Sequence, residues 1–310
     1  MSYNVRGQVP ALRALEGKLG ISPDKEVKMK HQRLSVDLLG MRVLITGGSR
    51  GIAAALVRAF AANGADVAFS YAALADKTAG QDKAAAELCA KTASPGRRVE
   101  AIEADLTKPD AARLLAAQAE YILGGIDTVV LSASIQVHRS FLAMPPEDVA
   151  RQFQINLTAN IELLQHLLPG MRAQGWGRII SIGSIQELAP SAEMPIYAMT
   201  KAALENLVRN LAVENAAYGI TVNNISPGLI ETDRNAFRRQ DMDDWKRLTR
   251  RANPMQRAGQ PHDIAGAALF LASGAASFVT AATIHVTGGA HVPRAANDPR
   301  DSEVKPGVVS

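Results

Sequence analysis

The sequence predicts a single doubly wound α/β domain, of the Rossmann type, with a mainly parallel sheet of seven strands. From Met41 onward, short β-branched runs alternate with Ala- and Leu-rich helical stretches, and most of these runs are continuously apolar. Strands of that kind are buried on both faces, as in a parallel sheet covered by helices. The chain has 310 residues, of which 47% are hydrophobic and 21% charged, so it can bury one large core without a second domain.

The predicted strands follow one another along the chain, separated by helical stretches. In order they are residues 41–46 (MRVLIT), 65–70 (ADVAFS), 97–104 (RRVEAIEA), 127–134 (DTVVLSAS), 177–184 (GRIISIGS), 219–226 (GITVNNIS) and 281–288 (AATIHVTG). Residues 1–39 stand outside the alternation, either as a partly ordered arm or as an arm that packs on a neighbouring subunit. We therefore expect an N-terminal extension over 1–39, the α/β domain over 40–292 and a polar, Pro-containing flexible tail over 293–310.

Composition excludes several classes of protein. The formal net charge is +4, but acidic and basic residues are interspersed, so we expect no nucleic-acid partner. Cys89 is the only cysteine, which excludes an internal disulfide. No apolar run reaches about 18 residues, and the first thirty residues carry charges, so we expect no membrane partner and a cytoplasmic location. The histidines lack the spacing of metal ligands, so we expect no metal.

A glycine-containing loop follows the first predicted strand and leads into a helical run. It reads Thr46-Gly47-Gly48-Ser49-Arg50-Gly51-Ile52-Ala53. Glycines let the backbone approach a pyrophosphate, and the start of a helix offers free N–H groups and the positive end of its dipole. This context predicts a dinucleotide site. The alternative is an ordinary strand-to-helix turn.

The end of the second predicted strand bears on the choice of cofactor. NAD-binding folds usually carry an acidic residue there, about 20 residues beyond the glycines, for the ribose hydroxyls. Here the segment reads Phe69-Ser70-Tyr71-Ala72, without an acid, whereas Arg50 in the loop can pair with a 2′-phosphate. The sequence therefore favours NADP(H) over NAD(H).

Three further residues suggest acid-base chemistry. Tyr197 and Lys201 stand at positions i and i+4 of a predicted helix, so a cation can lean on a phenol and favour its ionised form. Ser184 lies where a buried strand ends, which is where open α/β sheets place ligands. Each residue also has an ordinary explanation, because such pairs occur on solvated helix faces and serine often ends strands. Their combination with the glycine loop favours a site.

These motifs together resemble the short-chain dehydrogenase/reductase family over residues 40–292, including members that are 3-oxoacyl-[acyl-carrier-protein] reductases and glucose or gluconate dehydrogenases. The resemblance implies a catalytic set of Ser184, Tyr197, Lys201 and Asn156, the last in QINLTANIEL. It also implies a set of cofactor-binding positions: Gly47, Ser49, Arg50, Gly51, Ile52, Asp105, Leu106, Ser132, Ala133, Ser134, Tyr197, Lys201, Pro227, Gly228, Ile230 and Thr232. A homo-oligomer, tetramer or dimer, is implied as well.

The implied mechanism gives each catalytic residue a role. Ser184 and Tyr197 bind a carbonyl oxygen, and Tyr197 transfers the proton. Lys201 holds the nicotinamide ribose and lowers the pKa of the phenol, while Asn156 bends its helix and holds a water that joins the lysine to solvent. The reaction is reduction of a carbonyl to an alcohol, or the reverse, on a small-molecule substrate.

The sequence departs from the family pattern in two places. Ala53 replaces the third glycine of the loop, a change that dinucleotide folds accept. Leu131-Ser132-Ala133-Ser134 replaces the usual NNAG, and its serines can take over the asparagines' hydrogen bonds only in part. This motivates an alternative from another class, a non-catalytic dinucleotide-binding or scaffold protein on the same fold.

Two segments bear on the substrate, namely 185–196 (IQELAPSAEMPI) and 233–255 (DRNAFRRQDMDDWKRLTRRANPM). The second reads either as a basic lid that attracts an anionic or phosphopantetheine-linked substrate, or as a solvated helix face. A 3-oxoacyl thioester and a sugar or polyol therefore both remain candidate substrates.

Overall fold

A computed structural model describes residues 36–72 and 80–293. Most of the predicted N-terminal extension and of the predicted tail lies outside these residues, so both stay predictions. A boundary between residues 35 and 36 marks the start of the α/β unit, and Leu38 is 2% exposed within the core of this unit. The α/β unit thus begins a few residues before the predicted boundary at residue 40.

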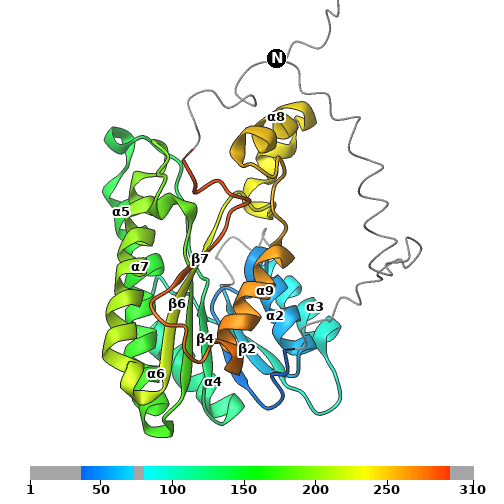
Figure 1. The fold of residues 1–310 in the computed structure, drawn as a ribbon, viewed down its shortest axis with the longest axis vertical. Coiled ribbons are helices and arrows are strands. Elements are labelled where there is room, and N and C mark those ends of the chain that lie inside the picture. Colours follow the sequence, from blue (N-terminus) through cyan, green and yellow to red (C-terminus); the bar gives the residue numbers. More distant parts are fainter. Residues whose placement is uncertain (1–35, 73–79, 294–310) are drawn as a thin grey trace, which may run out of the picture. The chain divides into compact units, whose positions relative to one another are not determined.

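The sheet has seven strands in the order β3-β2-β1-β4-β5-β6-β7, and every neighbouring pair is parallel (Figure 1). The strands are β1 (Arg42–Ile45), β2 (Asp66–Tyr71), β3 (Val99–Glu103), β4 (Thr128–Leu131), β5 (Gly177–Ile182), β6 (Ile220–Pro227) and β7 (Thr283–Val286). The predicted doubly wound fold is confirmed, with a sheet that is wholly parallel. Strand β4 ends at Leu131, so the unusual serine-containing segment is a loop at the carboxyl edge.

Helices connect the strands in the described residues. They are α2 (Gly51–Ala62), α3 (Gln81–Thr92), α4 (Ala111–Leu123), α5 (Pro146–Phe153), α6 (Ala159–Gln174), α7 (Pro195–Asn215), α8 (Met242–Ala252) and α9 (Pro261–Ala272). Short helical turns are η3 (Phe141–Ala143), η4 (Gln154–Thr158, a π-helical turn), η5 (Ile185–Glu187), η6 (Ala216–Tyr218), η7 (Asp233–Arg239) and η8 (Gly274–Ala276). Within the described ranges, none of the helices combines the length and the apolar character needed to cross a membrane.

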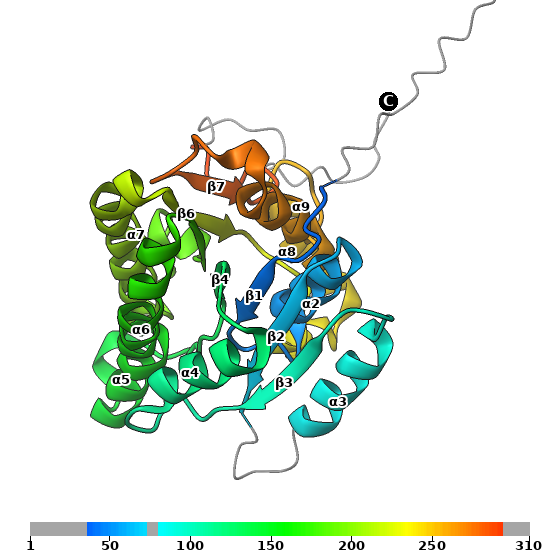
Figure 2. The same ribbon diagram turned by 90° about the horizontal axis from the view of Figure 1, so that it is seen from below.

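The helices cover both faces of the sheet, because successive strand residues point to opposite sides. Val43 and Ile45 of β1 pack with α2, α3 and α9, whereas Leu44 packs with α4, α6 and α7 on the other face (Figure 2). All three strand residues are fully buried. The near-continuous apolar strands of the sequence are therefore explained by two hydrophobic layers, one on each side of the sheet.

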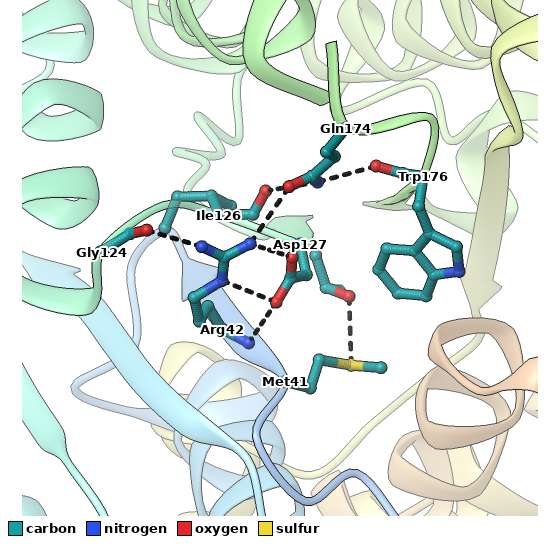
Figure 3. A network of polar contacts seen from close by, with 8 residues as sticks. Met41, Arg42, Gly124, Ile126, Asp127, Gln174 and Trp176 are labelled. Carbon is teal, nitrogen blue, oxygen red and sulfur yellow. Dashed lines mark hydrogen bonds and ion pairs between the residues drawn. The ribbon is translucent and has the colours of Figure 1, made fainter. Parts of the chain in front are cut away.

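A polar cluster at the amino end of the sheet joins β1 to β4 (Figure 3). The guanidinium of Arg42 forms an ion pair with Asp127, and its Nε donates to Oδ2 at 2.8 Å. Further donors of Arg42 reach the carbonyl oxygen of Gly124 at 2.6 Å and Oε1 of Gln174 at 3.1 Å. The Arg42 and Asp127 side chains are only 27% and 16% exposed, so this pair is better shielded than an ordinary surface pair.

We expect Asp127→Asn to lower the free energy of unfolding by about 1–3 kcal/mol, since it leaves a partly buried guanidinium without its charged acceptor. Denaturant unfolding measures the loss. Glu87→Gln is the control, because the Glu87–Lys91 pair is 51% and 68% exposed and should contribute less than about 1 kcal/mol. Equal losses in both variants would contradict the prediction. Cofactor affinity should not change, because the cluster lies at the sheet edge opposite to the cavity described next.

Candidate active site

A cavity of about 430 Å³ lies at the carboxyl edge of the sheet. Its walls include every predicted cofactor-binding residue together with Ser184, Tyr197 and Lys201. Asn156 is the one predicted site residue that does not line it. Segments separated by more than a hundred residues in the sequence thus meet at one place, as expected where parallel strands end.

The glycine loop has a backbone that larger residues would not tolerate. Gly47 and Gly51 adopt left-handed φ angles of +71° and +58°. A Cβ on Gly48 would lie 2.5 Å from Cβ of Phe69, so the loop packs directly on β2. Ser70 anchors it further, because its Oγ accepts a hydrogen bond from the Gly47 N–H at 3.0 Å. The end of β2, where the sequence has no acidic residue, therefore also supports the glycine loop.

The start of α2 fits a phosphate group. Its N-cap residue is Arg50, whose extended backbone leads into Gly51 and whose side chain does not cap the helix. The first N–H groups of a helix need acceptors, and with the positive end of the dipole they favour an anion. The loop and this helix end line the cavity together, so the residues present fit the pyrophosphate of a dinucleotide.

Thr46 organises the unusual segment after β4. Its Oγ1 accepts hydrogen bonds from the backbone N–H groups of Ser132 and Ala133, both at 2.9 Å. Ala133 also approaches the glycine loop closely, because a Cβ on Gly47 would lie 3.0 Å from its Cα. The loop after β4 is therefore held through its backbone, which does not require the asparagines of the family pattern.

The remaining predicted cofactor positions complete the walls. Asp105 accepts from the N–H and hydroxyl of Thr107 at 3.0 and 2.6 Å, which shapes the turn after β3 beside the buried Leu106. Gly228, at the end of β6, packs against the backbone of Thr287 with no space for a Cβ.

Ser184 begins the short turn η5 and is held by a reciprocal cap. Its Oγ accepts from the N–H of Gln186 at 3.2 Å, and Glu187 accepts from the Ser184 N–H at 2.9 Å. The other carboxylate oxygen of Glu187 accepts from Asn224 Nδ2 at 3.1 Å. Glu187 was missed at the level of sequence, although Ser184-Ile-Gln-Glu187 matches the serine-x-x-glutamate capping signature.

Tyr197 and Lys201 face the cavity from the first turns of α7, at 6% and 2% exposure. The Nζ of Lys201 lies 5.8 Å from the tyrosine ring centroid and donates to the carbonyl oxygen of Ile182 at 2.6 Å. Burial, helped by the charge of Arg234, lowers the pKa of Lys201 to about 8. The lysine and the phenol thus share one face of the helix, as their spacing predicts.

Arg234, which the sequence analysis did not single out, acts on the Tyr197 phenol more directly than Lys201 does. Burial raises the pKa of Tyr197, while the charge of Arg234 and hydrogen bonding to Ser184 and Arg234 oppose the rise. The expected lowering by Lys201 is not among these causes. The lysine donates instead to the Ile182 carbonyl, and burial lowers the pKa of its own ammonium group. No motif marks Arg234, because its position depends on how η7 folds over the cavity.

Asn156 lies behind the cavity wall, within the π-helical turn η4 that joins α5 to α6. Its amide is occupied by neighbours: Oδ1 accepts from the Ile135 N–H at 2.8 Å, and Nδ2 donates to the Ile135 carbonyl at 2.9 Å and to Thr200 Oγ1 at 3.1 Å. The helix is irregular there, as expected, and the side chain ties the loop after β4 to α7. Its role in holding a water stays a prediction.

Two histidines that lie six residues apart in the sequence meet in the fold, because the rings of His285 and His291 stack with their centroids 4.4 Å apart. Among the residues described, no group of three or more His, Cys, Asp or Glu side chains is arranged to hold a metal ion.

We expect Glu187 to make stability depend on pH. Burial and the nearby Glu205 raise its pKa to about 7, against hydrogen bonds from Ser184 and Asn224 and the charge of Lys201. Between about pH 4.5 and 7 the folded chain keeps a proton that the unfolded chain has released, so stability falls as the pH rises. Glu187→Gln should remove this contribution, and Asn224 can turn its unpartnered buried Oδ1 toward the new amide.

Denaturant unfolding of both proteins at several pH values measures the effect. The difference in free energy of unfolding, variant minus wild type, should grow as the pH rises from about 5 to about 8. Parallel curves would contradict the assignment.

Comparison with known proteins identifies the chain. The family model described as enoyl-(acyl carrier protein) reductase matches residues 47–291. A Serratia marcescens short-chain dehydrogenase/reductase structure is similar with a TM-score of 0.74 and 31% identity, covering 82% of this chain and 99% of that one. The chain belongs to the short-chain dehydrogenase/reductase family. It is therefore an oxidoreductase of the short-chain alcohol dehydrogenase and ketoreductase kind, as the sequence predicts.

Proteins with different named activities are similarly related to this chain. A 3-oxoacyl (acyl-carrier-protein) reductase from Agrobacterium tumefaciens C58, with NADP bound, is 39% identical with a TM-score of 0.75 and covers 85% of this chain and 100% of its own. L-rhamnose 1-dehydrogenase (NAD(P)(+)) of Azotobacter vinelandii is 36% identical, over 82% of this chain and 98% of its own length. The Escherichia coli cyclic-di-GMP-binding biofilm dispersal mediator protein is also 36% identical, over 81% and 97%.

Proposed function

We propose that this protein uses NADP(H) to interconvert a carbonyl group and an alcohol, with Tyr197 as the proton donor and acceptor. The observation that carries the proposal is the meeting of Ser184, Tyr197 and Lys201 in the cavity that also contains the glycine loop and the start of α2. A phenol, a hydroxyl and a cation beside a loop that fits a pyrophosphate suit the transfer of a hydride and a proton to a carbonyl.

The chain's own residues divide the work. When bound, the cofactor supplies or accepts the hydride; Gly47, Gly51 and the first N–H groups of α2 would hold its pyrophosphate. The hydroxyls of Ser184 and Tyr197 donate hydrogen bonds to the carbonyl oxygen, and Tyr197 gives its proton to that oxygen. Lys201 would hold the nicotinamide ribose, and Arg234 would supply positive charge that stabilises the phenolate left behind.

The preference for NADP(H) rests on Arg50 and on the absence of an acid at the end of β2. Arg50 lines the cavity beside Tyr71 and Ala72. We expect Arg50→Glu to raise the KM for NADPH at least about tenfold and the KM for NADH much less, because the new carboxylate repels the 2′-phosphate. Arg58→Glu makes the same change on an exposed position of α2 and should leave both values unchanged. A wild-type enzyme with a lower KM and higher turnover for NADH would contradict the preference.

A 3-oxoacyl thioester and a sugar or polyol are two candidate substrate classes, since relatives of both kinds are about equally similar. NADPH oxidation with acetoacetyl thioesters and simple ketones, and NADP⁺ reduction with sugars and polyols, separates these classes. We further propose a homo-oligomer in the cytoplasm, and a native mass measurement tests the assembly.

A non-catalytic binding protein is the second candidate. The cyclic-di-GMP-binding relative is the observation that favours it. Turnover with any carbonyl compound that disappears in Tyr197→Phe would exclude it, whereas nucleotide binding without turnover by wild type would support it.

A further inference from the structure

The turn η7 brings one arginine of the Arg-rich segment into the cavity. The guanidinium of Arg234 donates to the carbonyl oxygen of Ser134 at 2.8 Å, and both terminal nitrogens lie 3.4 Å from Ser134 Oγ. Both residues line the cavity that holds Tyr197. The side chain therefore reaches from η7 to the loop after β4, where the unusual serine provides one of its acceptors.

Arg234 differs from other arginines of the chain in its partners. Arg239, also on η7, pairs with Glu231 and with Asn235, and Arg247 on α8 forms an ion pair with Asp244. Among residues 36–72 and 80–293, no carboxylate forms an ion pair with Arg234. A guanidinium has five N–H donors in a planar fork that matches a carboxylate, and the neutral oxygens of Ser134 and Tyr197 do not exhaust them. Because Arg234 is exposed, a charged acceptor can reach these donors.

The surroundings of Arg234 favour an anion at this point. Its positive charge acts on both Tyr197 and Lys201, and Arg238 also lines the cavity. Like charges that converge in a partly enclosed site repel one another, and a bound anion relieves the repulsion. The pyrophosphate of the cofactor belongs at the glycine loop and α2, whereas Arg234 stands with Ser134 and Tyr197 at the catalytic end.

We propose that Arg234 binds a carboxylate of the substrate, so that the preferred substrates are 2-oxo or 3-oxo acids, or the matching hydroxy acids. The carboxylate must lie close to the reacting carbonyl of the same substrate. The reason is that the Arg234 guanidinium contacts Ser134 and also interacts with the Tyr197 phenol, which binds the carbonyl oxygen. A carboxylate one or two carbons from the carbonyl reaches it while the carbonyl oxygen meets Ser184 and Tyr197. The proposal rests on the proposed function and names the substrate class of the same site.

The test compares acids with their esters. Steady-state kinetics with NADPH use acetoacetate against ethyl acetoacetate, and pyruvate against methyl pyruvate. Wild type should prefer the acids by about ten- to a hundredfold in kcat/KM. Arg234→Gln should abolish the preference by raising the KM for the acids. Arg247→Gln removes the same charge from the exposed face of α8 and should keep the preference.

A binding measurement separates this proposal from the proposed function. Calorimetry measures the binding of malonate, which carries carboxylates but no reducible ketone. The proteins are wild type, Arg234→Gln and Arg247→Gln, each saturated with NADP⁺. Weaker binding in Arg234→Gln alone supports the anion site even if no carbonyl compound is reduced. Equal malonate binding in all three proteins would overturn the proposal. So would a loss of kcat/KM in Arg234→Gln that is equal for acids and esters, or a loss of affinity for NADPH in that variant.

Discussion

Replacing Tyr197 with phenylalanine should reduce kcat by about 10²- to 10⁴-fold, because it deletes the transferable proton and leaves the ring in place. The ring is 6% exposed within the cavity wall, so the variant should fold and should still bind NADPH. Reduction of acetoacetate, acetoacetyl thioesters and simple ketones measures the first effect, and equilibrium titration with NADPH measures the second.

Tyr121→Phe is the matched control, since this tyrosine is 90% exposed on α4 and outside the cavity. It should retain full turnover. Unchanged turnover in Tyr197→Phe would refute the role of the phenol, and a loss accompanied by weak NADPH binding would indicate a damaged site instead.

Gly183→Ala should have the second largest effect, because a side chain in the loop that carries Ser184 fits only if the Glu187 carboxylate moves away. A Cβ there would lie 1.9 Å from Oε1 of Glu187 and 2.7 Å from Oδ1 of Asn224. The carboxylate would have to leave the Ser184 N–H that it caps. We expect a loss of about 1–3 kcal/mol in unfolding free energy and of about 10²-fold in kcat, since a displacement of about 1 Å near the reacting groups suffices for that.

A double-mutant cycle identifies the cause. If the clash with Glu187 is responsible, Gly183→Ala should cost much less in a Glu187→Ala background than in wild type. Gly266→Ala is the glycine control, because a Cβ at this exposed position in α9 meets nothing within 4 Å. It should leave activity unchanged and stability equal or slightly higher. Additive losses in the cycle would contradict the proposed contact.

Residue order was sufficient to predict the fold class, the seven strands and most of the cavity wall. The apolar runs predicted buried strands. The glycine pattern predicted a turn, and the φ angles of Gly47 and Gly51 in this turn are left-handed. The i, i+4 spacing of Tyr197 and Lys201 was sufficient to place both on one helix face. These features are local, because each depends on backbone geometry within a few residues.

Contacts between distant segments were decided only by the tertiary structure. Thr46 holds the loop after β4 across 86 residues, Asn156 bonds to Ile135 and Thr200 instead of lining the cavity, and Arg234 reaches Ser134 across 100 residues. Contacts of this kind leave no periodic pattern in the sequence, because they depend on where the loops lie once the sheet has formed. The meeting of Ser184, Tyr197 and Lys201 in one cavity could therefore be predicted from sequence, whereas the charge of Arg234 that faces them from η7 could not.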